Sequence, residues 1–137
     1  MNTTQQQSAR HEAIEKPFAE RVAEARSEVP PISAADAHDH RLRDPDTLFI
    51  DPRPAKAIAD TTGLIPGALN LTLDRLNSAG DLPPELASRS RPIIAACQGG
   101  AMGALAARAL KHRGFTNVKY LDGGTQAWLD AGYPTER

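Results

Sequence analysis

The clearest chemical potential in this chain lies in Cys97 and the short segment that follows it. The sequence contains one cysteine, which ends an apolar run and directly precedes Gln98-Gly99-Gly100-Ala101-Met102-Gly103. The glycines allow a turn whose backbone N–H groups point inward and hold an anion. A helix that begins beside such a turn adds unpaired N–H groups and positive partial charge. The segment therefore predicts a sulfur anion, or an anion bound to sulfur, held by the main chain alone.

The same position is also typical of a small core residue. Free cysteines are often buried and behave as small hydrophobic side chains. We favour the reactive interpretation, but the position and the glycines alone leave both alternatives open.

A single cysteine excludes an internal disulfide and any metal site built from several cysteines. The histidines do not suggest a metal site either, because His38 and His40 stand only two positions apart and would point to different sides of a helix. We therefore predict no metal site and no cofactor. Surface positions are expected for all four histidines, which are His11, His38, His40 and His112.

Composition and charge exclude several classes of partner. The 137 residues carry a net charge of -1, which gives no electrostatic footprint for nucleic acid or an anionic membrane surface. No apolar stretch approaches the roughly 18 residues needed to span a bilayer. Residues 1–7 lack the basic and apolar regions of a secretory signal. These features predict a single domain in the cytoplasm, where a lone thiol stays reduced.

The elements that must position Cys97 alternate between strands and helices. Strands are predicted over residues 47–50, 68–71, 92–96 and 117–121. Helices are predicted over residues 34–43, 54–60, 73–79, 103–113 and 123–130, with an irregular helical piece after Pro83-Pro84. This alternation predicts an α/β fold with a central, mostly parallel sheet flanked by helices.

The N-terminal region has a different character. Residues 1 to about 10 are polar, and no regular structure is expected there. A helix is predicted over residues 11–27, because one apolar stripe runs through Ile14, Phe18, Val22 and Ala25. Pro30-Pro31 ends this helix. We expect it to pack on its own domain, while a dimer through this helix remains the alternative to a monomer.

In an open parallel sheet, ligand sites form beyond the carboxyl ends of the strands. The predicted strands bring several segments to that edge, which are Asp51, Arg53, Thr72 to Arg75, Cys97 and Asp122-Gly123-Gly124. Arg89 and Arg91 precede the central strand and are expected at the far edge. They are therefore poor candidates for the site.

Four separated pieces of the chain resemble, in order, the motifs of a rhodanese-like domain. Residues 50–53 resemble the family's strand ending in Asp-x-Arg, and residues 63–70 resemble its Gly-His-Ile-Pro-Gly-Ala segment. Cys97-x-x-Gly100 is similar to the start of its active-site loop, and residues 121–134 to its C-terminal Gly-Gly-x-x-Ala-Trp and Gly-x-Pro signature. We accordingly expect a rhodanese-like domain over residues 31–137, preceded by a polar tail and helix over residues 1–30.

This resemblance implies a three-layer fold and a sulfurtransferase whose active-site cysteine carries a persulfide. The thiolate of Cys97 would take the outer sulfur from a small anionic donor such as thiosulfate and release sulfite. The persulfide would then pass that sulfur to cyanide, a thiol or a protein sulfur carrier, and ping-pong kinetics should follow. A single cysteine leaves no resolving partner within the chain, so the acceptor must come from outside.

The sequence departs from the family in the second half of the loop, where many active members carry a basic residue. Here those positions read Ala101-Met102-Gly103. Loss of a charge-assisted contact costs about 1.5–3 kcal/mol, so we expect only a weak preference for dianionic thiosulfate. Arg75 is a candidate for supplying charge from a neighbouring loop. We interpret Asp51 and Arg53 as structural support in preference to substrate contacts. Trp128 is interpreted as a core anchor.

Two other functions compete with sulfur transfer. Phosphatase relatives of this fold have an arginine after five residues that follow the cysteine, and Gly103 stands at that place. Without an arginine to hold phosphate bidentately, phosphatase or arsenate reductase chemistry is not expected. The alternative from another class is a rhodanese-like interaction or regulatory module with little turnover. The missing basic residues favour that module, whereas Cys97 and its glycines favour the enzyme.

Overall fold

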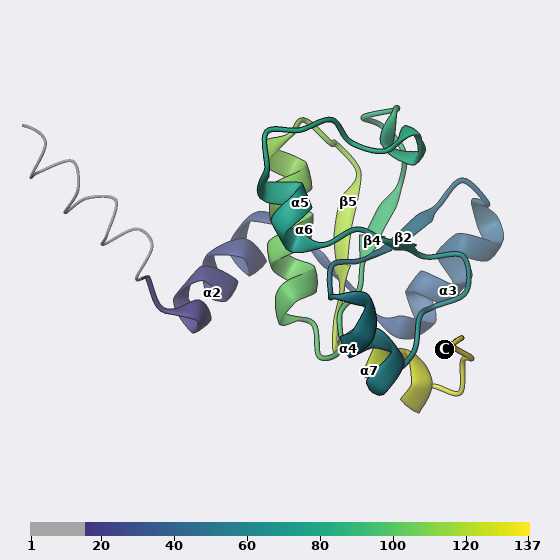
Figure 1. The fold of residues 1–137 in the computed structure, drawn as a ribbon. Helices are drawn as coiled ribbons and strands as arrows, with labels where there is room; N and C mark the ends of the chain where they lie inside the picture. The colour runs from purple at the N-terminus through teal and green to yellow at the C-terminus, as the bar shows by residue number, and fades with distance from the viewer. Residues whose placement is uncertain (1–15) are drawn as a thin grey trace, which may run out of the picture.

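Five parallel strands form the central layer of the molecule (Figure 1), and they lie in the order β1-β5-β4-β2-β3. The computed structural model describes residues 16–137. The strands are β1 (Pro31–Ile32), β2 (Leu48–Asp51), β3 (Leu69–Asn70), β4 (Ile93–Ala95) and β5 (Val118–Leu121). All neighbouring pairs are parallel. Strand β4 is therefore central, and Cys97 leaves the sheet near its middle.

Helices cover both faces of this sheet. They are α2 (Phe18–Glu28), α3 (Ala34–Arg43), α4 (Ala55–Asp60), α5 (Leu73–Asn77), α6 (Ala101–His112) and α7 (Gly124–Asp130), with a short 3₁₀ turn η1 (Pro84–Leu86). Successive strand residues point to opposite faces. Ile93 and Ala95 accordingly pack in the core beneath α2, α5 and α6, while Ile94 and Ala96 pack in the core beneath α3 and α7. The three-layer α/β fold predicted from the sequence is confirmed.

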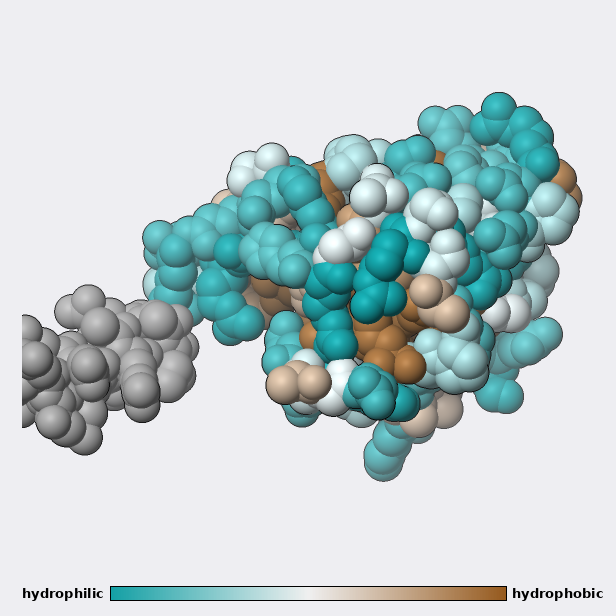
Figure 2. Space-filling model, turned by 90° about the horizontal axis from the view of Figure 1, so that it is seen from above, coloured by the Kyte–Doolittle hydropathy of each residue, from teal (hydrophilic) through white to brown (hydrophobic). Residues whose placement is uncertain are grey.

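In Figure 1 the carboxyl ends of β4 and β5 lie at the lower edge of the sheet, where α6 and α7 begin. The opposite end of the molecule, seen from above in Figure 2, carries mostly hydrophilic side chains. Arg89 and Arg91 bind backbone carbonyls there, on Leu86, Arg113, Asp46 and Glu85. These contacts agree with their expected place away from the site. None of the helices between residues 16 and 137 is long and apolar enough to cross a membrane.

Most predicted elements of residues 31–137 begin and end within two residues of the observed bounds. Strand β1 was not predicted, because Pro30-Pro31 were interpreted only as the end of a helix. The carbonyl of Pro30 accepts a hydrogen bond from the N–H of Tyr120, and that of Ile32 accepts one from Asp122. Proline is tolerated in this strand because it lies at the edge of the sheet, where one side of the strand needs no N–H donor.

The N-terminal helix differs from its prediction within the described residues. Helix α2 begins at Phe18, after Pro17, and not at residue 11. A proline disfavours the helical conformation of the residue before it, so a helix cannot continue smoothly through Lys16-Pro17. His11, Ile14 and the expectation for residues 1–10 lie outside the described residues. Phe18 was expected on the buried stripe, but its side chain is 51% exposed.

Helix α2 packs against α6 of the same chain, as expected. Val22 and Ala25 are buried in the core that also contains Leu105 of α6. The carboxylate of Glu28 pairs with Arg108 and His112, and its backbone carbonyl accepts a hydrogen bond from the Lys111 ammonium. The hydrogen bond from His112 and the nearby charges of Arg108, His112 and Lys111 lower the pKa of Glu28, against an opposing effect of burial. Apolar burial and ion pairs together attach α2 to the domain.

Two of the histidines expected at the surface are half-buried. His38 stacks on the ring of Tyr133, with 4.1 Å between the ring centroids. Nδ1 of His40 lies 2.8 Å from the hydroxyl of Thr47. His112 is more exposed and pairs with Glu28. Residues 16–137 contain no cluster of three His, Cys, Asp or Glu side chains that could hold a metal ion.

Candidate active site around Cys97

Cys97 lies in a tight turn between β4 and α6. Its side chain is only 3% exposed. The backbone N–H of Gly100 donates a hydrogen bond to Sγ of Cys97 over 3.0 Å. The sulfur is therefore held at the beginning of α6, where positive partial charge of the helix is concentrated.

The helix begins two residues earlier than predicted. Gly100 has φ +108°, a backbone conformation that favours glycine, and the chain enters α6 at Ala101. Ala101, Met102 and Gly103 therefore belong to the first helical turn and not to an extended loop. Their backbone N–H groups make no hydrogen bond to any of residues 16–137, as is usual at the start of a helix. These free donors lie next to the sulfur-bearing turn.

Gly103 serves close packing of this helix on the sheet. A Cβ atom at Gly103 would lie 2.9 Å from the carbonyl oxygen of Ala95 in β4. No larger residue fits at this point without moving either α6 or β4. The distance between the helix and the strand that carries Cys97 is therefore set by backbone contact.

The start of α7 supports the Cys97 turn from behind. The N–H of Thr125 donates to the carbonyl of Cys97 over 2.6 Å, and the N–H of Gln126 donates to the carbonyl of Gln98 over 3.1 Å. Gly124 has φ +64°, and a Cβ there would lie 2.5 Å from both carbonyl oxygens. Sequence reasoning placed Gly123-Gly124 at this edge but missed their role. The glycine pair directly before a helix was the available signal.

Asp51 and Arg53 form a buried ion pair at the end of β2. Nε and Nη2 of Arg53 donate to the two carboxylate oxygens of Asp51 over 3.0 and 2.7 Å. The remaining contacts of the guanidinium go to the hydroxyls of Thr61 and Thr62 and to the carbonyl of Gly63. The side chains of Asp51 and Arg53 are only 2% and 5% exposed. Each nitrogen of this guanidinium is thus occupied in joining β2 to residues 61–63.

A model of the rhodanese-like domain matches residues 33–131 of this chain. The chain belongs to the rhodanese-like family.

Solved structures with the same fold include proteins of several descriptions. A protein of unknown function from Rhodopseudomonas palustris, described as a possible tyrosine phosphatase, is 28% identical with a TM-score of 0.76, over 89% of this chain and 96% of that one. The polysulfide-sulfur transferase homodimer of Wolinella succinogenes is 23% identical with a TM-score of 0.65, over 87% and 86%. A human single-domain sulfurtransferase is 25% identical with a TM-score of 0.63, over 74% and 96%.

Within this rhodanese-like domain, Arg75 takes no visible part in the site. It lies on α5, and its exposed side chain makes no hydrogen bond or ion pair with residues 16–137. The structure thus brings Cys97 together with the backbone of residues 98–103 and with α7. Asp51 and Arg53 lie at the end of the neighbouring strand β2, with their side chains engaged by each other and by residues 61–63.

Trp128 of the rhodanese-like domain is a core anchor, as the sequence predicted. The ring is fully buried and packs edge-on against Phe49 of β2. Its indole N–H donates to the carbonyl of Pro134 over 2.9 Å. The C-terminal signature of the family therefore holds α7 in place on the sheet, and α7 in turn holds the Cys97 turn.

Proposed function

We propose that the protein is a sulfurtransferase, in which Cys97 accepts a sulfane sulfur as a persulfide and passes it to an external thiol or cyanide. The observation that carries this proposal is the hydrogen bond from Gly100 to Sγ of Cys97, beside the free N–H groups of residues 101–103. Membership of the rhodanese-like family supports it, as does the presence of sulfurtransferases among similar structures.

The first half-reaction loads the cysteine. The thiolate of Cys97 attacks the outer sulfur of a donor such as thiosulfate, and a new S–S bond forms at Cys97. The S–S bond of thiosulfate breaks, and its electron pair leaves on sulfite. The negative charge on the bound sulfur then faces the N–H groups at the start of α6, which are already oriented before the reaction.

The second half-reaction empties the cysteine. An acceptor thiolate attacks the outer sulfur of the persulfide, forms a new S–S bond and displaces the Cys97 thiolate. Because the sequence holds no second cysteine, no internal disulfide can end the cycle. The acceptor must therefore enter the site from outside.

The choice of donor depends on charge near the turn. Residues 98–103 include no cation, and the guanidinium of Arg53 is engaged by Asp51, Thr61 and Thr62. A strongly charged donor such as thiosulfate should therefore bind weakly. Polysulfide is a second candidate, because the similar Wolinella succinogenes protein is described as a polysulfide-sulfur transferase.

A phosphatase function is not proposed, although one similar structure is described as a possible tyrosine phosphatase. The position at which phosphatase relatives carry their arginine is Gly103, which has no room for a side chain against Ala95. Bidentate binding of a phosphate by that arginine is therefore impossible here.

The decisive experiment measures loading directly. The protein is incubated with thiosulfate or polysulfide, and its intact mass is recorded before and after treatment with cyanide. We expect a gain of one sulfur atom that cyanide removes and that is missing in Cys97→Ser. Failure of the folded wild type to gain sulfur from either donor would favour the interaction module instead. The cytoplasmic location expected from the sequence stays a prediction.

A further inference from the structure

A groove lies between α2 and the start of α6. It has a volume of about 530 Å³ and is lined by Phe18, Ala19, Val22, Ala23, Arg26 and Ala101. All of these side chains except Arg26 are apolar. Ala101 is the first residue of α6, four positions after Cys97. The groove therefore reaches the helical turn that borders the sulfur.

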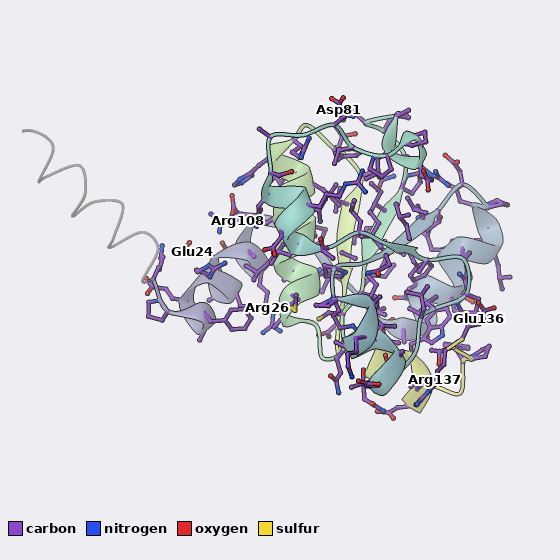
Figure 3. All side chains as sticks on the ribbon, in the orientation of Figure 1. Glu24, Arg26, Asp81, Arg108, Glu136 and Arg137 are labelled. Atoms are coloured by element: carbon purple, nitrogen blue, oxygen red, sulfur yellow. The ribbon has the colours of Figure 1, made fainter. Side chains whose placement is uncertain are left out.

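Arg26 is the cation of this groove, and it is not engaged by an acidic side chain of residues 16–137. Its side chain is exposed, and its guanidinium carbon lies 6.0 Å from the centroid of the Tyr120 ring. Figure 3 shows Arg26 beside the lower end of α6, where the chain arrives from β4. A positive charge that no acidic side chain of residues 16–137 neutralises thus stands at the end of α6 that carries the proposed site.

Two other cations near this side of α2 are engaged in ion pairs. Lys16 pairs with Glu24, and Arg108 pairs with both Glu24 and Glu28. These contacts account for the acidic residues on the side of α2 that faces α6. Within the described part of the chain, no acidic side chain competes with an anionic ligand for Arg26.

We propose that this groove binds the organic part of the acceptor thiol, and that Arg26 pairs with a carboxylate at the end of that molecule. The proposal rests on the sulfurtransferase function and specifies its acceptor. Thiosulfate has no apolar part, so the apolar walls fit an organic thiol better than they fit this donor. An aliphatic thiol with a terminal carboxylate matches both the walls and the charge. Arg26 would be a specificity residue that does not touch the transferred sulfur.

The transfer step is the second half-reaction with a defined acceptor. The acceptor thiol releases its proton to solvent, and its sulfur forms a bond to the outer sulfur of the Cys97 persulfide. The bond between the two persulfide sulfurs breaks, and its electron pair returns to Cys97. The product is a carboxylate-bearing persulfide, and no oxidant or reductant is needed.

The test compares acceptors that differ in charge. The full chain is first loaded with sulfur at Cys97, and the loss of that sulfur is followed by intact mass. The acceptors are 3-mercaptopropionate (anionic), 2-mercaptoethanol (neutral) and cysteamine (cationic). For each acceptor, the second-order rate constant of the wild type is divided by that of the variant. This ratio cancels the intrinsic reactivity of the thiol.

We expect Arg26→Gln to lower the preference for 3-mercaptopropionate over 2-mercaptoethanol about threefold, in the range of an exposed ion pair. Arg26→Glu should lower it about tenfold and raise the relative rate with cysteamine. Arg26→Lys should restore most of the preference. Arg21→Gln on the same helix is the matched control and should leave the preference unchanged.

Equal acceptor preferences in the wild type, Arg26→Gln and Arg26→Glu would overturn the proposal. Circular dichroism of each variant shows that α2 is still folded. If the wild type cannot be loaded with sulfur at all, the sulfurtransferase function itself fails. A loaded protein that discharges to every thiol without regard to charge contradicts only the role of Arg26.

Discussion

The backbone N–H of Thr125 donates a hydrogen bond of 2.6 Å to the carbonyl oxygen of Cys97. This contact turns the carbonyl of Cys97 toward α7, while the sulfur of the same residue receives the N–H of Gly100. The turn is thus held from both sides by main-chain groups. A buried carbonyl needs such a partner in any fold, so only the contact from Gly100 to the sulfur bears directly on the proposed role of Cys97.

Substitution of Gly124 by alanine should disturb this turn. The new Cβ would lie 2.5 Å from the carbonyl oxygens of Cys97 and Gln98, at a φ of +64°. We expect a loss of at least about 2 kcal/mol in the free energy of unfolding, measured by urea denaturation, together with slower sulfur loading. Gly99→Ala is the control, because a Cβ there meets no atom within 4 Å. Equal stability of the two variants would contradict the close approach.

Removal of Arg53 distinguishes structural support from substrate binding. Arg53→Met leaves the carboxylate of Asp51 buried without its partner, and loss of one member of a buried pair costs about 3–5 kcal/mol. We expect a large fall in thermal stability. Arg53→Lys should also be destabilising, because lysine cannot reproduce the two parallel hydrogen bonds to Asp51. A variant of normal stability that loads sulfur poorly would instead indicate a substrate contact.

An added cation at position 102 should improve loading from thiosulfate. Met102 is half-buried in the first turn of α6. A charge-assisted contact contributes at least about 1.5 kcal/mol, so Met102→Arg should raise the loading rate about tenfold at low salt. Met102→Gln is the neutral control and should have no such effect. Loading rates that stay equal in all three proteins would show that this position does not face the donor.

The attachment of α2 should weaken in acid. The hydrogen bond from His112 and the charges of Arg108, His112 and Lys111 hold the pKa of Glu28 below its ordinary value of 4.5. A lowered pKa means that the ionised carboxylate stabilises the fold above pH 4.5, and that this contribution disappears as the pH falls through the lowered value.

The measurement compares melting temperatures of the wild type and Glu28→Gln between pH 7 and pH 3. The wild type should be more stable at pH 7, and the difference should shrink toward pH 3. Glu85→Gln is the control, because Glu85 is exposed and its carboxylate pairs with none of residues 16–137. A difference that stays constant with pH would mean that Glu28 contributes through packing alone.

Local signals in the sequence predicted much of the fold. The end of α6 was correctly placed because Lys111 and His112 favour the last turn and Gly114, at φ +94°, closes it. Its beginning was two residues off, since the sequence does not show which glycine adopts positive φ. Strand β1 escaped prediction because two residues cannot display a periodic pattern.

The site was predicted in part for a similar reason. Cys97 directly follows the predicted strand over residues 92–96, so its place at the carboxyl edge of a parallel sheet could be predicted from the sequence. The role of Gly124 depends on how closely α7 approaches the turn, which is a contact between segments more than 25 residues apart. The exposure of Phe18 was predicted wrongly because an apolar stripe shows which residues share a face of α2, but not how far the partner helix extends along it.

The backbone contact between Gly103 and Ala95 has an evolutionary consequence. Gln98 and Gly99 are exposed, and a Cβ at position 99 meets no atom within 4 Å, so substitutions there should leave the contact between α6 and β4 in place. Under the proposed function, relatives that use other sulfur donors should therefore vary at these two exposed positions while keeping glycine at position 103.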